Sequence, residues 1–130
     1  MPSFGTLKAD TLTHSTAGSL ATNYVVEGAN KAWIQRDFNS NVIDSSLNIS
    51  TVTDNALGDQ TMNITSAMND AVYAVTGMAS RKGNSTNFHV VMIHDSADPT
   101  TTAYRLRCSD VSGNDKDPQF VSTAVKGDLA

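Results

Sequence analysis

Short runs of alternating apolar and polar residues, separated by clusters of turn-forming residues, make up most of the chain after residue 24. Neighbouring side chains of a strand point to opposite faces, so a period of two predicts strands with one buried face. The run 61–65 is a clear case, because it places Met62 and Ile64 together on the inner face. It is expected to form a hairpin with the run 47–50, with a bulge near Ser50 or Thr51 that restores the phase.

The run 104–108 alternates equally well. It is expected to place Tyr104, Leu106 and Cys108 on the buried face of a strand, and Arg105 and Arg107 on the opposite face. The arginine face is interpreted either as a solvated surface or as an ion-paired contact with a neighbouring chain.

Residues 71–79 allow two interpretations. Met68, Val72 and Val75 lie at helical spacing, which favours a helix. The β-branched residues of this segment and the internal Gly77 favour a strand, because they lower helix propensity and suit a pleated sheet. We therefore expect a strand here, and further strands over 24–26, 87–95 and 120–125.

About seven or eight short strands at regular spacing predict an all-β fold, an antiparallel β-sandwich or barrel-like domain over residues 24–130. Residues 1–23 are polar and hold few large apolar side chains. They are expected to form an extended N-terminal arm used for docking or oligomer contact, with a disordered tail as the alternative. The candidate contact residues of this arm are Phe4, Leu7, Leu12 and Leu20.

The composition limits the size of the core and the class of partner. Hydrophobic residues make up 39% of the chain and charged residues only 17%, so Ser, Thr and Asn must cover much of the surface. A thin core of this kind favours association with further copies of the chain. The net charge of −4 and the absence of a basic run argue against nucleic acid as a partner. No apolar stretch is long enough to predict membrane insertion.

The sequence nominates no catalytic, cofactor or metal site. His89 and His94 share a predicted strand at an odd separation, so they are expected on opposite faces, where they cannot bind one metal ion. Cys108 is the only cysteine and is expected to be buried and inert. Nucleophile-elbow and phosphate-loop motifs do not occur. We therefore expect a protein that is not an enzyme and needs no cofactor.

The remaining residues of interest fall into two groups. Trp33 is interpreted as a core or interface residue, with carbohydrate stacking as the weaker alternative. The full set of candidate core or interface residues is Trp33, Ile49, Ile64, Tyr73, Val91, Ile93, Tyr104 and Leu106. The candidate exposed-loop residues are Asp54, Asp59, Arg81, Lys82, Asn84, Asp115, Lys116 and Asp117, and their Asp, Asn and Gly neighbours are typical of loop tips.

Four stretches of the chain form a recognisable series. They are Lys-Ala-Trp at 31–33, an Asn-rich strand with a Thr-Asp-Asn loop at 45–55, Gly-Asp followed by an alternating strand at 58–64, and a Met-Asn-Asp-Ala-Val-Tyr run within 67–75. In this order they resemble a module of tail-fibre-like proteins of marine bacteriophages. The resemblance covers roughly residues 24–95. One departure is the segment 37–41, which stands where the module has an Asp-Gly turn.

The resemblance implies a non-enzymatic virion structural protein, a tail or fibre module displayed on the particle and in contact with the host surface. It also implies a homo-oligomer, with a trimer favoured, and other virion proteins and a host surface glycan as partners. Two alternatives remain open. One is a capsid decoration or head-fibre protein held by its N-terminal arm, and the other is a carbohydrate-binding or hydrolytic domain.

Overall fold

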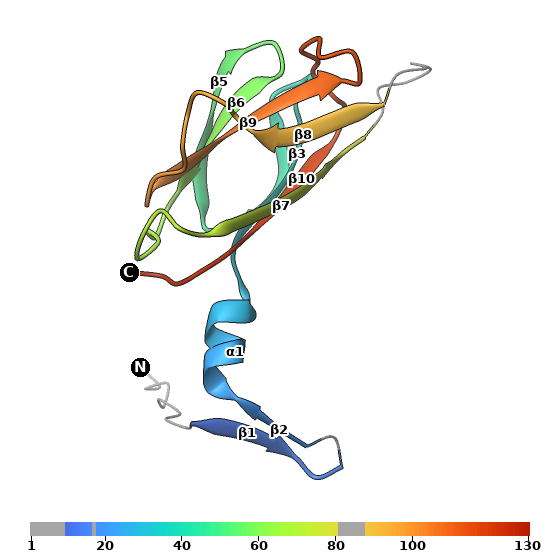
Figure 1. The fold of residues 1–130 in the computed structure, drawn as a ribbon. Coiled ribbons are helices and arrows are strands. Elements are labelled where there is room, and N and C mark those ends of the chain that lie inside the picture. Colours follow the sequence, from blue (N-terminus) through green and yellow to red (C-terminus); the bar gives the residue numbers. More distant parts are fainter. Residues whose placement is uncertain (1–9, 17, 81–87) are drawn as a thin grey trace.

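The computed structural model describes residues 10–16, 18–80 and 88–130 (Figure 1). Within these ranges the chain forms ten strands and one short helix. In chain order the elements are β1 Thr11–His14, β2 Gly18–Ala21, α1 Thr22–Gly28, β3 Asn30–Asp37, β4 Val42–Leu47, β5 Ile49–Ala56, β6 Asp59–Ile64, β7 Ala74–Ala79, β8 His89–Ile93, β9 Ala103–Asp110 and β10 Val121–Lys126. The expectation of an all-β, antiparallel fold is confirmed.

Eight of the strands form two antiparallel sheets that face each other (Figure 1). The first sheet has the order β4-β3-β10-β7 and is called the Trp sheet, because β3 carries Trp33. The second has the order β5-β6-β9-β8 and is called the Arg sheet, because β9 carries Arg105 and Arg107. The remaining pair, β1 and β2, forms a separate hairpin.

The core lies between the two sheets and is built from alternate residues of their central strands. β3 and β10 supply Ala32, Ile34, Val121 and Val125, and β6 and β9 supply Met62, Ile64, Tyr104, Leu106 and Cys108. A buried hydrogen bond of 2.8 Å between the Tyr104 and Thr123 hydroxyl groups joins the sheets. Burial of these side chains supplies the main favourable free energy of folding.

A sharp corner at Asn48 leads the chain from the Trp sheet into the Arg sheet. Asn48 has a φ of 56°, and its side chain holds the corner in place. The side-chain amide donates to the carbonyl oxygens of Lys31 and Ser66, both at 3.1 Å, and its oxygen accepts the Ser66 N–H at 2.6 Å. Asparagine adopts a positive φ more readily than most residues, so the sequence suits this turn.

Three sequence expectations about strands are confirmed. Residues 74–79 form a strand, β7, and residues 121–126 form β10. β5 and β6 pair as a hairpin whose register shifts between Ile49 and Thr51, which is the expected bulge. The loop of this hairpin is shorter than expected, because β5 continues to Ala56 and β6 begins at Asp59.

The expected strand at 24–26 is wrong. Residues 22–28 form the helix α1, in which the Ala29 N–H donates to the Val25 carbonyl oxygen at 3.1 Å. The segment lies outside both sheets (Figure 1) and pairs with no described strand. A helix satisfies its own backbone hydrogen bonds without a partner, which outweighs the β propensity of three residues.

The described part of the N-terminal arm forms a hairpin that leads into the helix rather than one extended segment, and residues 1–9 lie outside the described residues. β1 pairs with β2, and Leu12 lies opposite Leu20. Figure 1 shows that the hairpin and α1 project from one end of the two sheets. In the described part of the chain, no helix is long and apolar enough to cross a membrane.

Candidate functional site

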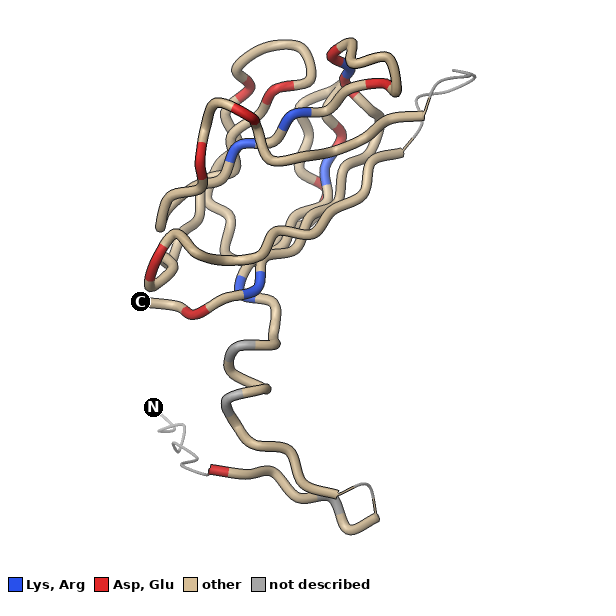
Figure 2. Tube along the Cα trace, viewed as in Figure 1, with Lys and Arg blue, Asp and Glu red and all other residues tan. Residues whose placement is uncertain are grey.

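The outer face of the Arg sheet carries a cluster of charged residues centred on Asp59. Figure 2 shows basic residues of β9 with acidic residues on either side. The Asp59 carboxylate accepts hydrogen bonds from Arg105 through both Nε, at 2.7 Å, and a terminal nitrogen. Asn55 adds a third hydrogen bond of 3.2 Å. Asp59 is only 8% exposed, so the expectation that it lies in an exposed loop is wrong.

Arg107 is held in the same way by carboxylates from two loops. Its Nε donates to Asp115 Oδ1 at 2.7 Å, and a terminal nitrogen lies 3.7 Å from Asp95 Oδ2. Both arginines of β9 are therefore on the outer face, as expected, and both form ion pairs within the chain. These pairs fix the loops that follow β8 and β9 rather than leaving free charges for a neighbouring chain.

His94 brings the three groups of a Ser-His-Asp triad together beside this cluster. Its Nε2 lies 3.6 Å from Asp59 Oδ2, and its Nδ1 lies 3.1 Å from the Ser96 hydroxyl oxygen. The distance to Asp59 exceeds a hydrogen bond, and Asp59 is already bound by Arg105. The Ser96 N–H also donates to the same Nδ1, at 3.2 Å, so the contact is part of a tight turn. This geometry favours a structural role over nucleophilic catalysis.

The ion pair with Arg105 makes part of the stability dependent on pH. Hydrogen bonding to Arg105 lowers the pKa of Asp59 below its ordinary value. A carboxylate whose pKa is lowered by folding stabilises the fold above its unfolded pKa of about 4, and that contribution is lost as the pH falls through the folded pKa.

Asp59→Asn is therefore expected to be less stable than wild type at pH 7. The difference between the two should begin to shrink as the pH falls below about 4, where the carboxyl group of the unfolded wild type takes up its proton, and should be lost as the pH falls through the lower pKa of folded Asp59. Urea unfolding at a series of pH values measures this, with Asp44→Asn, an exposed position on β4, as the control for net charge. A difference that stays constant down to pH 2 would contradict the role given to Asp59.

The loop that joins β9 to β10 is held by its own carboxylates. Asp110 Oδ1 accepts the N–H groups of Ser112 and Asn114 at 2.9 and 3.0 Å. The Asn114 N–H contributes most to the lowered pKa of Asp110. Asp117 Oδ1 accepts the Gly58 N–H at 2.7 Å, which ties this loop to the β5–β6 turn.

These contacts correct the expectation of exposed loop tips. Asp115, Lys116 and Asp117 lie in a loop as expected but are partly buried, whereas Asp54 is exposed as expected but lies in β5. Among the described residues, no group of three or more His, Cys, Asp or Glu side chains could hold a metal ion. Arg81, Lys82 and Asn84 lie outside the described residues.

The middle of the outer face of the Trp sheet has the opposite character, and the charged residues Lys31, Asp37 and Lys126 lie toward the strand ends. Two rows of residues cross its four strands: Leu47, Trp33, Ala124 and Thr76 in one row, and Ser45, Gln35, Ser122 and Met78 in the next. None of these eight residues is charged. We call them the uncharged face. Six of them, Trp33, Gln35, Thr76, Met78, Ser122 and Ala124, line a shallow groove.

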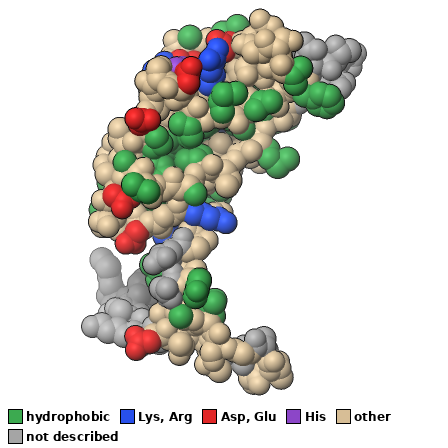
Figure 3. Space-filling model, viewed as in Figure 1, with side chains coloured by type: hydrophobic (Ala, Val, Ile, Leu, Met, Phe, Trp, Pro, Cys, Tyr) green, Lys and Arg blue, Asp and Glu red, His purple; other side chains and the backbone are tan. Residues whose placement is uncertain are grey.

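Apolar side chains stand out from this face. Met78 is 78% exposed and Leu47 is 50% exposed, while Trp33 between them is half-buried. Figure 3 shows that apolar side chains also reach the surface over the sheets and on the arm. Large apolar side chains gathered on one face are typical of a binding surface, whereas single ones are common on any protein.

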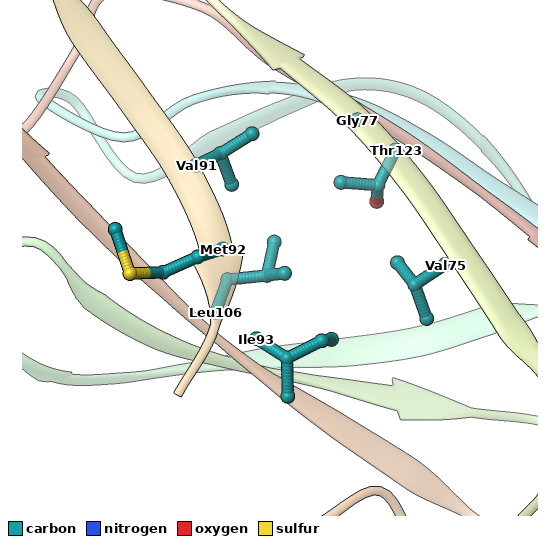
Figure 4. A pocket seen from close by; sticks show the side chains of 7 residues that line it. All are labelled: Val75, Gly77, Val91, Met92, Ile93, Leu106 and Thr123. Atoms are coloured by element: carbon teal, nitrogen blue, oxygen red, sulfur yellow. The ribbon is translucent and has the colours of Figure 1, made fainter. Parts of the chain in front are cut away.

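A second hollow lies between the sheets and is too small for an organic ligand. It measures about 30 Å³ and lies where β7 approaches β8 (Figure 4). Val75, Val91, Ile93 and Leu106 turn toward it (Figure 4). A space of this size holds one or two water molecules, whereas ligand sites measure several hundred Å³. The cavity is a packing defect rather than a binding site.

The other candidate residues divide between core and surface. Ile64, Tyr104 and Leu106 are buried, and Ile49, Tyr73, Val91 and Ile93 pack against the core while partly exposed. Cys108 is also buried, which raises the pKa of its thiol to about 12 and makes it a poor nucleophile at neutral pH. Leu12 and Leu20 form an exposed cross-strand pair, and Phe4 and Leu7 lie outside the described residues.

Sequence reasoning missed a polar group in which the exposed residue Asn41 binds two buried side chains, Arg36 and Gln60. The Asn41 side-chain oxygen accepts hydrogen bonds from Arg36 at 2.8 Å and from Gln60 at 2.9 Å, and its amide donates to Asp54 at 2.7 Å. Arg36 is 2% exposed, packs over the Phe38 ring, and has its pKa lowered by burial. No local sequence pattern predicts this group, because its members come from three separate strands and a loop.

Comparison of the chain with protein-family models, with curated proteins and with solved structures finds no match.

Proposed function

We propose that this chain is a non-enzymatic structural module of a bacteriophage particle and that it acts by assembling with further copies of itself. The observation that carries the proposal is the uncharged face of the Trp sheet. The sequence resemblance to tail-fibre-like modules supports the phage assignment and favours a tail or fibre position and a trimer.

The charge distribution favours self-association through this face. The chain has thirteen acidic and nine basic residues, so two copies carry a like net charge of −4 and repel each other overall. The eight residues of the uncharged face add no like charges when two copies meet. Trp33, on the inner strand β3, and Met78, on the edge strand β7, belong to the residue types that are enriched at the core of protein interfaces.

The groups that could perform chemistry support a structural role. Asp59 is held by Arg105, and the Ser96–His94 contact is part of a turn. Cys108 is buried with a raised pKa. A virion protein must keep its fold through changes in salt and dilution, and neutral polar strands depend little on screened ion pairs.

A capsid decoration or head-fibre protein is the first alternative, favoured by the arm that projects from one end of the sheets (Figure 1). In that case the arm binds the shell. Mass spectrometry of purified particles tests whether the protein belongs to a virion, and cryo-electron microscopy of the same particles separates a tail position from a head position. Absence of the protein from the particles would contradict the phage assignment.

Carbohydrate binding is the second alternative, and the groove favours it. Trp33 lies beside the amide of Gln35 and the hydroxyl group of Ser122, and sugars are commonly recognised by an aromatic ring flanked by neutral hydrogen-bonding groups. A binding assay on a panel of neutral polysaccharides, with Trp33→Ala as the control, separates this function from assembly.

Assembly is tested by the mass of the protein in solution. Wild type is expected to form a discrete oligomer at micromolar concentrations, whereas Met78→Asp places a charge in the groove and should give monomers. Leu57→Asp is the matched control, because Leu57 is an exposed apolar residue on the β5–β6 turn. Sedimentation equilibrium measures all three. A wild-type monomer, or ester hydrolysis that is lost in Ser96→Ala, would contradict the proposal.

A further inference from the structure

Among the described elements, the N-terminal hairpin has few contacts beyond its own two strands and the start of α1, which is less packing than a hairpin needs. β1 and β2 form a sheet of only two strands, and the helix that follows has seven residues. A two-stranded hairpin alone is marginally stable in water, and a helix shorter than about 12 residues is also marginal. The hairpin therefore requires a surface that covers one of its faces.

The hairpin presents an apolar pair on one face and hydroxyl groups on the other. Leu12 and Leu20 are direct cross-strand partners and are 41% and 46% exposed. On the opposite face the Thr13 and Ser19 hydroxyl groups form a hydrogen bond of 2.9 Å. The covering surface must therefore accept two adjacent leucines.

The uncharged face matches the hairpin in chemistry. Residues 11–26 contain no Asp, Glu, Lys or Arg, and neither do the eight residues of the uncharged face. Two neutral, partly apolar surfaces can be buried together without the cost of removing a charge from water. The groove beside Trp33 and Met78 offers apolar contact with Ser and Thr hydroxyl groups around it.

The hairpin does not cover the uncharged face of its own chain. It projects from one end of the sheets (Figure 1), and only Ala29 separates α1 from β3. The Lys31 ammonium group also donates to the Val26 carbonyl oxygen, which ties the helix to the start of β3. The groove that the hairpin can reach is therefore that of another copy.

We propose that the hairpin of each copy packs into the groove of the next copy, with Leu12 and Leu20 against Trp33 and Met78. This inference rests on the proposed self-assembly and names the segment that covers the uncharged face. The contact joins different surfaces of the two copies, so it forms a closed ring when the rotation between copies closes, and three copies make such a ring if the assembly is a trimer.

Two variants of the full chain test whether the hairpin of one copy packs into the groove of the next. The hairpin variant carries Leu12→Asp and Leu20→Asp, and the groove variant carries Met78→Asp. All three side chains are exposed in the single chain, so both variants should keep the circular dichroism spectrum of wild type. Both are expected to be monomers by sedimentation equilibrium, while the Leu57→Asp control keeps the wild-type mass.

Mixing the two variants gives the decisive result. The groove variant has an intact hairpin and the hairpin variant has an intact groove, so one good contact can form between them. A brief reaction with an amine cross-linker should trap a 1:1 heterodimer in the mixture and no dimer in either variant alone. An interface formed by two uncharged faces predicts no heterodimer, since the groove variant lacks that face.

The outcomes separate this inference from the proposed function. A hairpin variant that assembles like wild type, or a mixture without the heterodimer, overturns the proposed packing of the hairpin into the groove. Either result is still compatible with assembly through the uncharged face. A wild-type chain that is itself a monomer overturns the proposed function as well.

Discussion

Replacing Gly58 with alanine is expected to lower the free energy of unfolding by about 3 kcal/mol, the sum of backbone strain and a steric clash. Gly58 has a φ of 69°, which an L-residue adopts only with strain. An added Cβ would also lie 2.4 Å from the Cys108 carbonyl oxygen and 2.9 Å from the Lys116 nitrogen. Both are backbone atoms, so a side-chain rotation cannot relieve the clash.

The effect extends beyond the turn because Gly58 joins three segments. Its carbonyl oxygen accepts the Cys108 N–H at 2.7 Å, and its N–H donates to Asp117. A shift of this residue therefore disturbs β9 and the loop before β10 together. Thermal and urea unfolding measure the loss of stability.

Gly113→Ala is the matched control for this prediction. Gly113 also has a positive φ, of 83°, but an added Cβ would have no neighbour within 4 Å. The substitution should cost only the backbone strain, about 1 kcal/mol. Equal losses of stability in the two variants would show that the close approach at Gly58 is not as described.

Asn41→Gly is expected to lower the free energy of unfolding by about 1–3 kcal/mol, because it removes the acceptor of two donors on buried side chains. Asn41 has a φ of 59°, so glycine suits the backbone and the loss comes from the side chain. The guanidinium group of Arg36 loses its hydrogen bond to Oδ1, and so does the amide of Gln60. Urea unfolding at pH 7 measures the change.

A double-mutant cycle with Arg36→Met separates the buried charge from the rest of the group. Once Arg36 is replaced, Asn41→Gly should cost less, by about 1–2 kcal/mol, since no buried charge is left unpaired. If the losses in the free energy of unfolding of the two single variants add up to that of the double variant, the result would contradict the importance assigned to the Arg36–Asn41 hydrogen bond.

The alternation of apolar and polar residues along the chain was sufficient to predict the strands that have one apolar and one polar face. β6 and β9 bury the residues that the pattern placed inward, and the bulge near Thr51 follows from a break in phase. These features depend on neighbouring residues only. They are therefore within reach of sequence reasoning.

β3 shows where a polarity pattern fails. Its inner face carries Ala32, Ile34 and Arg36, whereas Trp33 and Gln35 point outward. The largest apolar residue of the strand thus lies on the surface and a charged residue lies in the core. Arg36 can be buried because Asn41 accepts its hydrogen bond, and that contact depends on the turn after β3.

Asp59 was misjudged for a related reason. As a residue after Gly58 it looks like part of a turn, but Arg105 binds it from 46 residues further along the chain. Pairing of β6 with β9 brings the two together, and no local signal encodes that pairing. The helix α1 was missed because its β-rich residues have no strand to pair with in the described fold.

Fluorescence of Trp33 during dilution tests assembly through the uncharged face most directly. Trp33 is the only tryptophan of the chain and lies on an inner strand of that face. The wavelength of its emission therefore reports whether another copy shields the indole ring from water. We expect emission at shorter wavelength in the oligomer and a shift to longer wavelength on dilution, at the same concentrations where the sedimentation mass falls to that of one chain. An oligomer that dissociates while the Trp33 emission stays constant would contradict the account.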